Sequence, residues 1–169
     1  LNADAGISLQ YRQPVWQYVH MRIFNSFVLI APAITFSYLL GSLVGAVMGT
    51  NRGSWFEKHG LIPVIFAGSF PSFFVAILLI IVFAGWLNIF PTSGMAGIGQ
   101  TFDTWWGVYV SESFAMHYVL PFTAVVCRYL FLPTLTMRTS VVETMGQDFS
   151  FYHRMTGLSK LRQLRHTMK

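Results

Sequence analysis

The side chains that could carry out catalysis are few in this sequence, and they form no recognisable site. Carboxylates and histidines are scattered along the chain, at Asp4, Glu57, Asp103, Glu112, Glu143 and Asp148, and at His20, His59, His117, His153 and His166. The histidines lack metal-ligand spacing, so we expect no metal ligands. No Gly-x-x-x-x-Gly-Lys-Ser/Thr loop occurs, so we expect no bound ATP. Because the carboxylates and histidines are scattered, we also expect no catalytic residues in this chain.

Glycines at a spacing of four residues form a second pattern. Gly41, Gly45 and Gly49 would lie on one face of a helix, where the missing side chains let another backbone approach closely. The pattern favours a packing contact between helices inside a bundle. A contact with a partner subunit is the alternative.

The charge pattern places these residues in a membrane. Of 169 residues, 54% are hydrophobic and 10% are charged, whereas soluble domains average about 25% charged residues. No charged residue occurs between Arg22 and Arg52, or between Lys58 and Asp103. Stretches of this kind indicate an all-α polytopic transmembrane bundle. The net charge of +5 lies beside apolar segments, so we assign it to membrane orientation and expect no nucleic-acid partner.

Three transmembrane helices are predicted, at residues 24–48, 61–90 and 117–136. The first is long enough to cross a hydrocarbon core of about 30 Å. Pro63 and Pro71 are expected to kink the second helix or to delay its start. Arg128 falls within the third helix, where it would line a water-filled path, pair with another helix, snorkel, or lie at a bundle interface.

Cation counting predicts the orientation of these helices. Eight Lys and Arg residues lie in the connection 49–60 and the tail 137–169, against two in residues 1–23 and 91–116. The connection and the tail are therefore expected in the cytoplasm. Residues 8–22 are amphipathic and are expected to lie along the outer interface. An external N-terminus needs an upstream helix, so we expect the sequence to be a fragment.

The basic tail is predicted to form two short helices. Met145, Phe149 and Tyr152 recur at helical spacing, Gly157 then interrupts, and Ser159 would cap a second helix. With cations on its outer faces, the tail would lie below the membrane. From the periodicity alone, it suits a basic helix pair held by anionic lipid.

Four segments, taken together, carry a resemblance to a known family. They are Gly6-Ile7-Ser8 with Gln13-Pro14-Val15 and Arg22-Ile23-Phe24-Asn25; Leu40-Gly41 to Gly45 with Asn51-Arg52-Gly53-Ser54-Trp55; Phe70-Pro71-Ser72 with Phe90-Pro91; and His117 to Pro121 with Met137-Arg138 to Phe149 and Gly157-Leu158-Ser159. Their order and spacing cover nearly the whole chain. The sequence thus resembles the inner-membrane permease of binding-protein-dependent ABC importers, of the dipeptide/oligopeptide type.

The resemblance implies a permease of six helices, of which these three would be the second, third and fourth. It implies that residues 137–169 are the cytoplasmic coupling loop, often called the EAA loop, which docks on an ATPase subunit. The coupling residues that it implies are Arg138, Glu143, Gly146, Asp148, Phe149, Gly157 and Leu158.

The same resemblance implies the partners of the chain. They would be a second permease subunit, two ABC ATPase subunits that bind the ATP, an external substrate-binding protein, and the lipid of the plasma (inner) membrane. The chain would hold no cofactor and catalyse no covalent step. Its cargo would be di- or oligopeptides, although related permeases carry nickel or sugars, and the sequence assigns no residue to the substrate path.

Two hypotheses from other classes compete with transport. A membrane scaffold or interaction subunit with a lipid-bound basic tail would share the span pattern but would have no ATPase partner. An intramembrane hydrolase would need a nucleophile such as Ser69 and a base within the spans. Because Ser69 lacks a Gly-x-Ser-x-Gly context and a histidine at its depth, the hydrolase is the weakest of the three.

Overall fold

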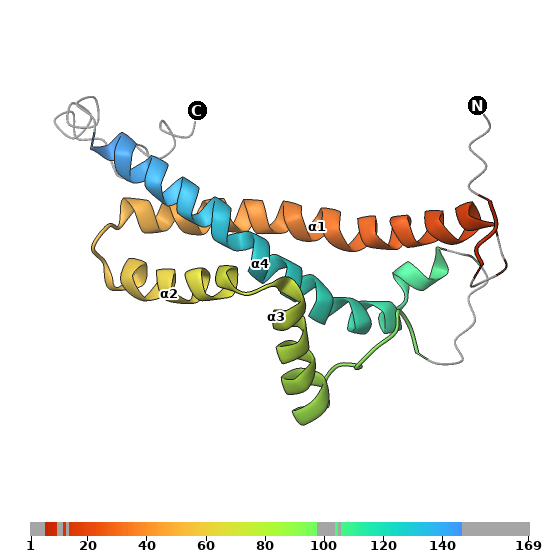
Figure 1. The fold of residues 1–169 in the computed structure, drawn as a ribbon. Coiled ribbons are helices and arrows are strands. Elements are labelled where there is room, and N and C mark those ends of the chain that lie inside the picture. The colour runs from red at the N-terminus through yellow and green to blue at the C-terminus, as the bar shows by residue number, and fades with distance from the viewer. Residues whose placement is uncertain (1–5, 10–11, 13, 98–103, 105, 147–169) are drawn as a thin grey trace.

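The fold is a bundle of helices, seen here in a computed structural model that describes residues 6–9, 12, 14–97, 104 and 106–146. All regular elements within these residues are helical, which confirms the predicted all-α class. In chain order they are α1 (Val15–Thr50), α2 (Trp55–Ser69), α3 (Ser72–Leu79), the π-helix η1 (Ile80–Trp86), the 3₁₀ helix η2 (Gly107–Val110) and α4 (Glu112–Met145) (Figure 1).

The helices α1 and α4 form the core of the bundle. They run in the same direction and cross, while α2 runs back along them (Figure 1). Small and medium apolar side chains fill the contact, among them Ala33, Ala46, Met48, Ala124 and Val141, each with an exposed fraction of 5% or less. We name the two ends of the bundle by their neighbouring segments. The connection end is where α1 and α4 finish, at Thr50 and Met145, and the loop end is where α4 begins.

Helix α1 is longer than the predicted span and begins at Val15. Of residues 8–22, predicted to lie along the outer interface, those from Val15 onward form the first turns of α1 and continue directly into the span. The physical reason is local. No glycine or proline occurs between Val15 and Pro32, so nothing in that stretch interrupts the helical hydrogen bonds.

The predicted second span is two helices rather than one. The axis turns by 106° between α2 and the segment formed by α3 and η1. Pro71 has no N–H to donate and pushes Phe70 into an extended conformation, with φ −96° and ψ 147°. Pro63, in contrast, lies inside α2 without ending it, and α2 starts upstream at Trp55. Only Pro71 has the interrupting effect expected of both prolines.

Helix α4 extends beyond the predicted 117–136 at both ends. Ser111 caps its N-terminus by accepting a hydrogen bond from the N–H of Phe114 at 3.1 Å. Pro121 and Pro133 lie within the helix without ending it. By length and composition, Val19–Thr50 and Glu112–Met145 could each cross a membrane, and the bent pair of α2 and α3–η1 adds a third candidate.

Candidate functional site

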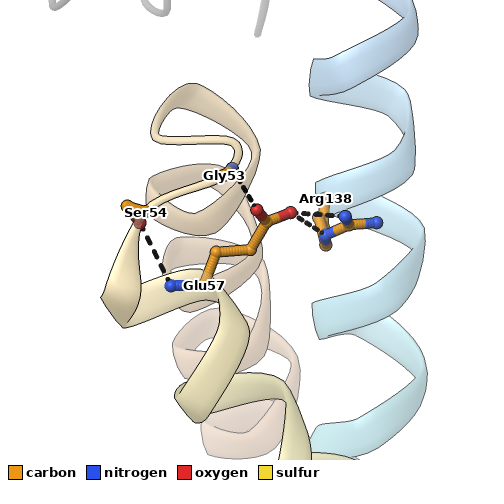
Figure 2. Close-up of polar contacts among 4 residues, drawn as sticks. All are labelled: Gly53, Ser54, Glu57 and Arg138. Atoms are coloured by element: carbon orange, nitrogen blue, oxygen red, sulfur yellow. Dashed lines mark hydrogen bonds and ion pairs between the residues drawn. The ribbon is translucent and has the colours of Figure 1, made fainter.

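A buried ion pair joins α2 to α4 at the connection end. The guanidinium of Arg138 donates two hydrogen bonds to Oε1 of Glu57, from Nε at 2.8 Å and from a terminal nitrogen (Figure 2). The Glu57 side chain is 6% exposed and that of Arg138 is 27% exposed. Two donors of one guanidinium converge on a single carboxylate oxygen, and charged hydrogen bonds of this kind are directional, so the pair fixes the start of α2 against one position of α4.

The short turn between α1 and α2 positions Glu57. Gly53 has φ +82°, a left-handed conformation that favours glycine, and its N–H donates to Oε2 of Glu57 at 2.5 Å. Ser54 accepts from the N–H of Glu57 at 3.1 Å and caps α2 (Figure 2). Both oxygens of the carboxylate are therefore satisfied, one by the turn and one by Arg138, as a buried charge requires.

The coupling residues predicted from the resemblance are only partly within the described chain. Arg138 lies on α4 and binds Glu57, Glu143 lies exposed near the end of α4, and Gly146 caps that helix in a right-handed conformation. Asp148, Phe149, Gly157 and Leu158 lie outside the described residues. Arg138 is thus engaged in holding helices of this chain together.

The predicted glycine face of α1 lies directly against α4. A Cβ at Gly41 would lie 2.8 Å from Cγ of Pro133, and a Cβ at Gly49 would lie 2.8 Å from Cβ of Val141. A Cβ at Gly45 would overlap the carbonyl oxygen of Thr134. The glycines therefore allow the two backbones to approach within one chain, and this contact occupies the face that the sequence singled out.

Two tyrosines tie α1 to its neighbours at the loop end. The hydroxyl of Tyr118 on α4 donates to the carbonyl of Val28 at 2.9 Å, and that of Tyr109 in η2 donates to Oδ1 of Asn25. The amide of Asn25 in turn contacts the sulfur of Met95 at 3.3 Å. These bonds connect α1, α4 and the loop that holds Met95.

A small cavity of about 250 Å³ lies between these elements. Its walls come from α1, the loop and α4, and are formed by Asn25, Ser26, Val28, Leu29, Gly94, Met95, Phe114, His117, Tyr118 and Pro121. Nδ1 of His117 donates to the carbonyl of Ser113 at 2.7 Å. With no charged side chain in its lining and one histidine already bonded, the cavity lacks the paired groups that acid–base chemistry needs.

The remaining candidate groups for metal binding or catalysis lie apart in the described part of the chain. No group of three His, Cys, Asp or Glu side chains lies close enough there to hold a metal ion. The hydroxyl of Ser69 donates to the carbonyl of Ile65 at 2.8 Å, an ordinary contact within α2. A few polar side chains join elements to one another instead, among them Glu57, Arg138 and Tyr118.

Two residues with structural roles are not evident from the sequence patterns above. In the sequence, Glu57 is only one of the scattered carboxylates. The available signal was the Ser-x-x-Glu spacing of Ser54 and Glu57, which is typical of a helix N-terminus. Gly68 belongs to no pattern, yet a Cβ there would overlap the ring of Phe131 on α4. No spacing marks Gly68, because its contact depends on how α2 crosses α4.

Comparison with known proteins places these features in a family. Residues 41–169 match the model of the family described as the binding-protein-dependent transport system inner membrane component. That range includes the glycine face and the Glu57–Arg138 pair. No solved structure matches the chain.

Individual relatives agree with the family match. The chain is 25% identical to the glutathione transport system permease protein GsiC of Pectobacterium atrosepticum, over 100% of the chain and 50% of the relative. It is 24% identical to the metal-staphylopine import system permease protein CntB of Staphylococcus aureus, over 97% of the chain and 47% of the relative. The chain is also 24% identical to the glutathione transport system permease protein GsiC of Salmonella typhimurium, over 95% of the chain and 47% of the relative.

The chain thus spans about half the length of the curated relatives it matches. The family match covers most of the chain, from the glycine face of α1 to Lys169. It confirms the resemblance to an inner-membrane permease, and the long apolar helices agree with it. The chain therefore belongs to the family of binding-protein-dependent transport system inner membrane components.

Proposed function

We propose that this chain forms part of the transmembrane path of an ABC importer for di- or oligopeptides. The family match over residues 41–169 is the observation that carries the proposal. Relatives named for the import of glutathione, itself a small peptide, favour a peptide cargo. An external binding protein would deliver the cargo, a second permease subunit would complete the path, and two separate ATPase subunits would drive it.

The proposed mechanism is alternating access. Closure of the ATPase subunits on ATP would move the cytoplasmic coupling segment, residues 137–169, whose first residues, 137–145, are the end of α4. Force would then pass to α1 and α2, because α4 is held to them by the glycine face and by the Glu57–Arg138 pair. A packed and hydrogen-bonded unit of this kind can transmit a displacement without absorbing it.

Uptake into proteoliposomes tests the function. The assembled transporter, with its binding protein outside and ATP inside, should accumulate a radiolabelled dipeptide. A matched preparation whose ATPase subunits cannot hydrolyse ATP should not. Assembly without ATP-dependent uptake of any peptide would contradict the proposed cargo.

Co-purification tests the coupling segment. Gly157→Pro, or reversal of both Glu143 and Asp148 to lysine, should weaken recovery of the ATPase subunits with the permease, because each change alters the proposed docking element. Retained binding in both variants would show that docking uses other residues. If the unaltered permease does not bind an ATPase at all, a scaffold with a lipid-bound tail becomes the better hypothesis.

A further inference from the structure

Arg128 lies midway along α4 without a polar partner among the described residues. Its side chain is partly exposed, and it forms no hydrogen bond or ion pair within that part of the chain. The helix is one of the two whose length and composition suit a membrane span. A permanent cation at this depth is costly unless it faces water or an anion, so its surroundings in the working protein must supply one of these.

The face of α4 that carries Arg128 is unusual for a helix in lipid. Spacings of four, four, three and four residues place Leu132, Thr136, Thr139 and Glu143 on the same face. Thr136, Thr139 and Glu143 are exposed, and Leu132 is the last large apolar side chain of α4 that is exposed. We call this set, with Arg128, the polar face of α4.

The exposed surface of α1 differs from this face in composition. Phe36, Leu39 and Leu43 on α1 are between 48% and 63% exposed, and their spacing places them on one side of that helix. The residues of α4 that meet the glycines of α1, such as Thr134 and Val141, lie on the side opposite the polar face. The polar face is therefore neither the packing surface toward α1 nor a surface suited to hydrocarbon.

We propose that Arg128 binds the carboxylate of the peptide cargo within the translocation path, and that the part of the polar face of α4 from Arg128 to Thr136 forms part of the wall of that path. This inference rests on the proposed function. The guanidinium stays charged at all working pH values and presents a planar fork that matches a carboxylate through paired hydrogen bonds. A peptide with a free C-terminus would satisfy the charge during passage, whereas a peptide ending in an amide would not.

The test compares two cargoes in the reconstituted transporter. One dipeptide has a free C-terminal carboxylate and the other has a C-terminal amide, and each is supplied with saturating binding protein. Any preference of the binding protein is the same for every permease variant, so it cancels when the free-acid to amide uptake ratios are compared. The variants are Arg128→Gln and Arg128→Lys, with Tyr129→Phe as an exposed neighbour that should leave the ratio unchanged.

Removal of the charge in Arg128→Gln should lower the free-acid to amide ratio by about tenfold, the effect of losing one charged hydrogen-bond partner. Arg128→Lys keeps the charge but not the fork, so its ratio should fall between those of the glutamine variant and the unaltered protein. If the glutamine variant does not assemble, the lysine variant carries the test.

Three results would overturn the inference. An unchanged ratio in the assembled variants would show that Arg128 does not recognise the carboxylate. An equal loss of both cargoes, together with weaker subunit assembly on gel filtration, would show that Arg128 pairs with an acidic group elsewhere in the transporter. A transporter with unaltered Arg128 that hydrolyses ATP but carries neither peptide would overturn peptide transport, and this inference with it.

Discussion

At the scale of single residues, the glycines of α1 set how closely α4 can approach. Gly45 is the most restrictive, because a Cβ there would overlap a backbone carbonyl, which cannot move aside as a flexible side chain can. Gly85 in η1 offers a matched control, since the nearest atom to a Cβ there, the carbonyl oxygen of Ile80, would be 3.8 Å away.

Gly45→Ala should therefore destabilise the assembled transporter, by about 1–3 kcal/mol or more if the helices must separate. Gly85→Ala should have little effect on stability. The measurement is the temperature at which each detergent-solubilised variant aggregates, followed by fluorescence-detected gel filtration. Equal temperatures for the two variants would show that α1 and α4 are not in close contact at Gly45.

The Glu57–Arg138 pair allows a second prediction at this scale. Arg138→Gln and Glu57→Gln should each destabilise the permease, because either change leaves a buried charge or its partner unsatisfied. The loss in free energy of unfolding in the double variant should be smaller than the sum of the losses in the two single variants, with a coupling energy of about 1–3 kcal/mol. Unfolding in mixed detergent micelles gives the free energy of unfolding of the unaltered protein, the two single variants and the double variant. Strictly additive losses would contradict the pairing.

The sequence indicated some of these residues and not others, for physical reasons. A four-residue spacing is a property of one helix, so Gly41, Gly45 and Gly49 could be read from the chain alone. The contact between Glu57 and Arg138 joins residues 81 positions apart, and its existence depends on how α2 lies against α4. The same limit applies to Gly68, whose neighbour is visible only in the folded bundle.

At the scale of elements, the break at Pro71 distinguishes this bundle from three straight spans. Spin labels at His59 and Ile81, both exposed, would be about 33 Å apart in a straight helix. With a turn of 106° at Pro71 they should be only about 20 Å apart. Pulsed electron paramagnetic resonance on the labelled transporter measures this distance, and a value near the longer one would contradict the broken helix.

The hydropathy of the sequence located the apolar segments, but it did not predict where the helices within them break or turn. An apolar run from Leu61 to Phe90 is equally compatible with one long tilted helix and with two short ones, because both bury the same side chains in lipid. The outcome depends on local backbone chemistry at Phe70 and Pro71, and on the packing of α3 against α4. The predicted lengths of α1 and α4 are too short, because polar residues in their terminal turns are also helical.

At the scale of the whole molecule, the direction of the helices makes the predicted orientation testable. Cysteines introduced at Asn51 and Ser93 lie on opposite ends of the bundle and are both exposed. In a background where Cys127, the sole natural cysteine, is changed to alanine, a membrane-impermeant maleimide should label Ser93→Cys from outside. Asn51→Cys should react only after the membrane is permeabilised. The reverse pattern would contradict the assignment of the basic tail to the cytoplasm.

The attachments between α1 and α4 also constrain how such a molecule can move. The pair is held by the hydroxyl of Tyr118 at the loop end, by glycine contacts further along, and through α2 by an ion pair at the connection end. Sliding one helix past the other by a single turn would break all of these together. The two helices should consequently move as one rigid body during a transport cycle. Any opening must then arise along the outer sides of the pair, not between α1 and α4.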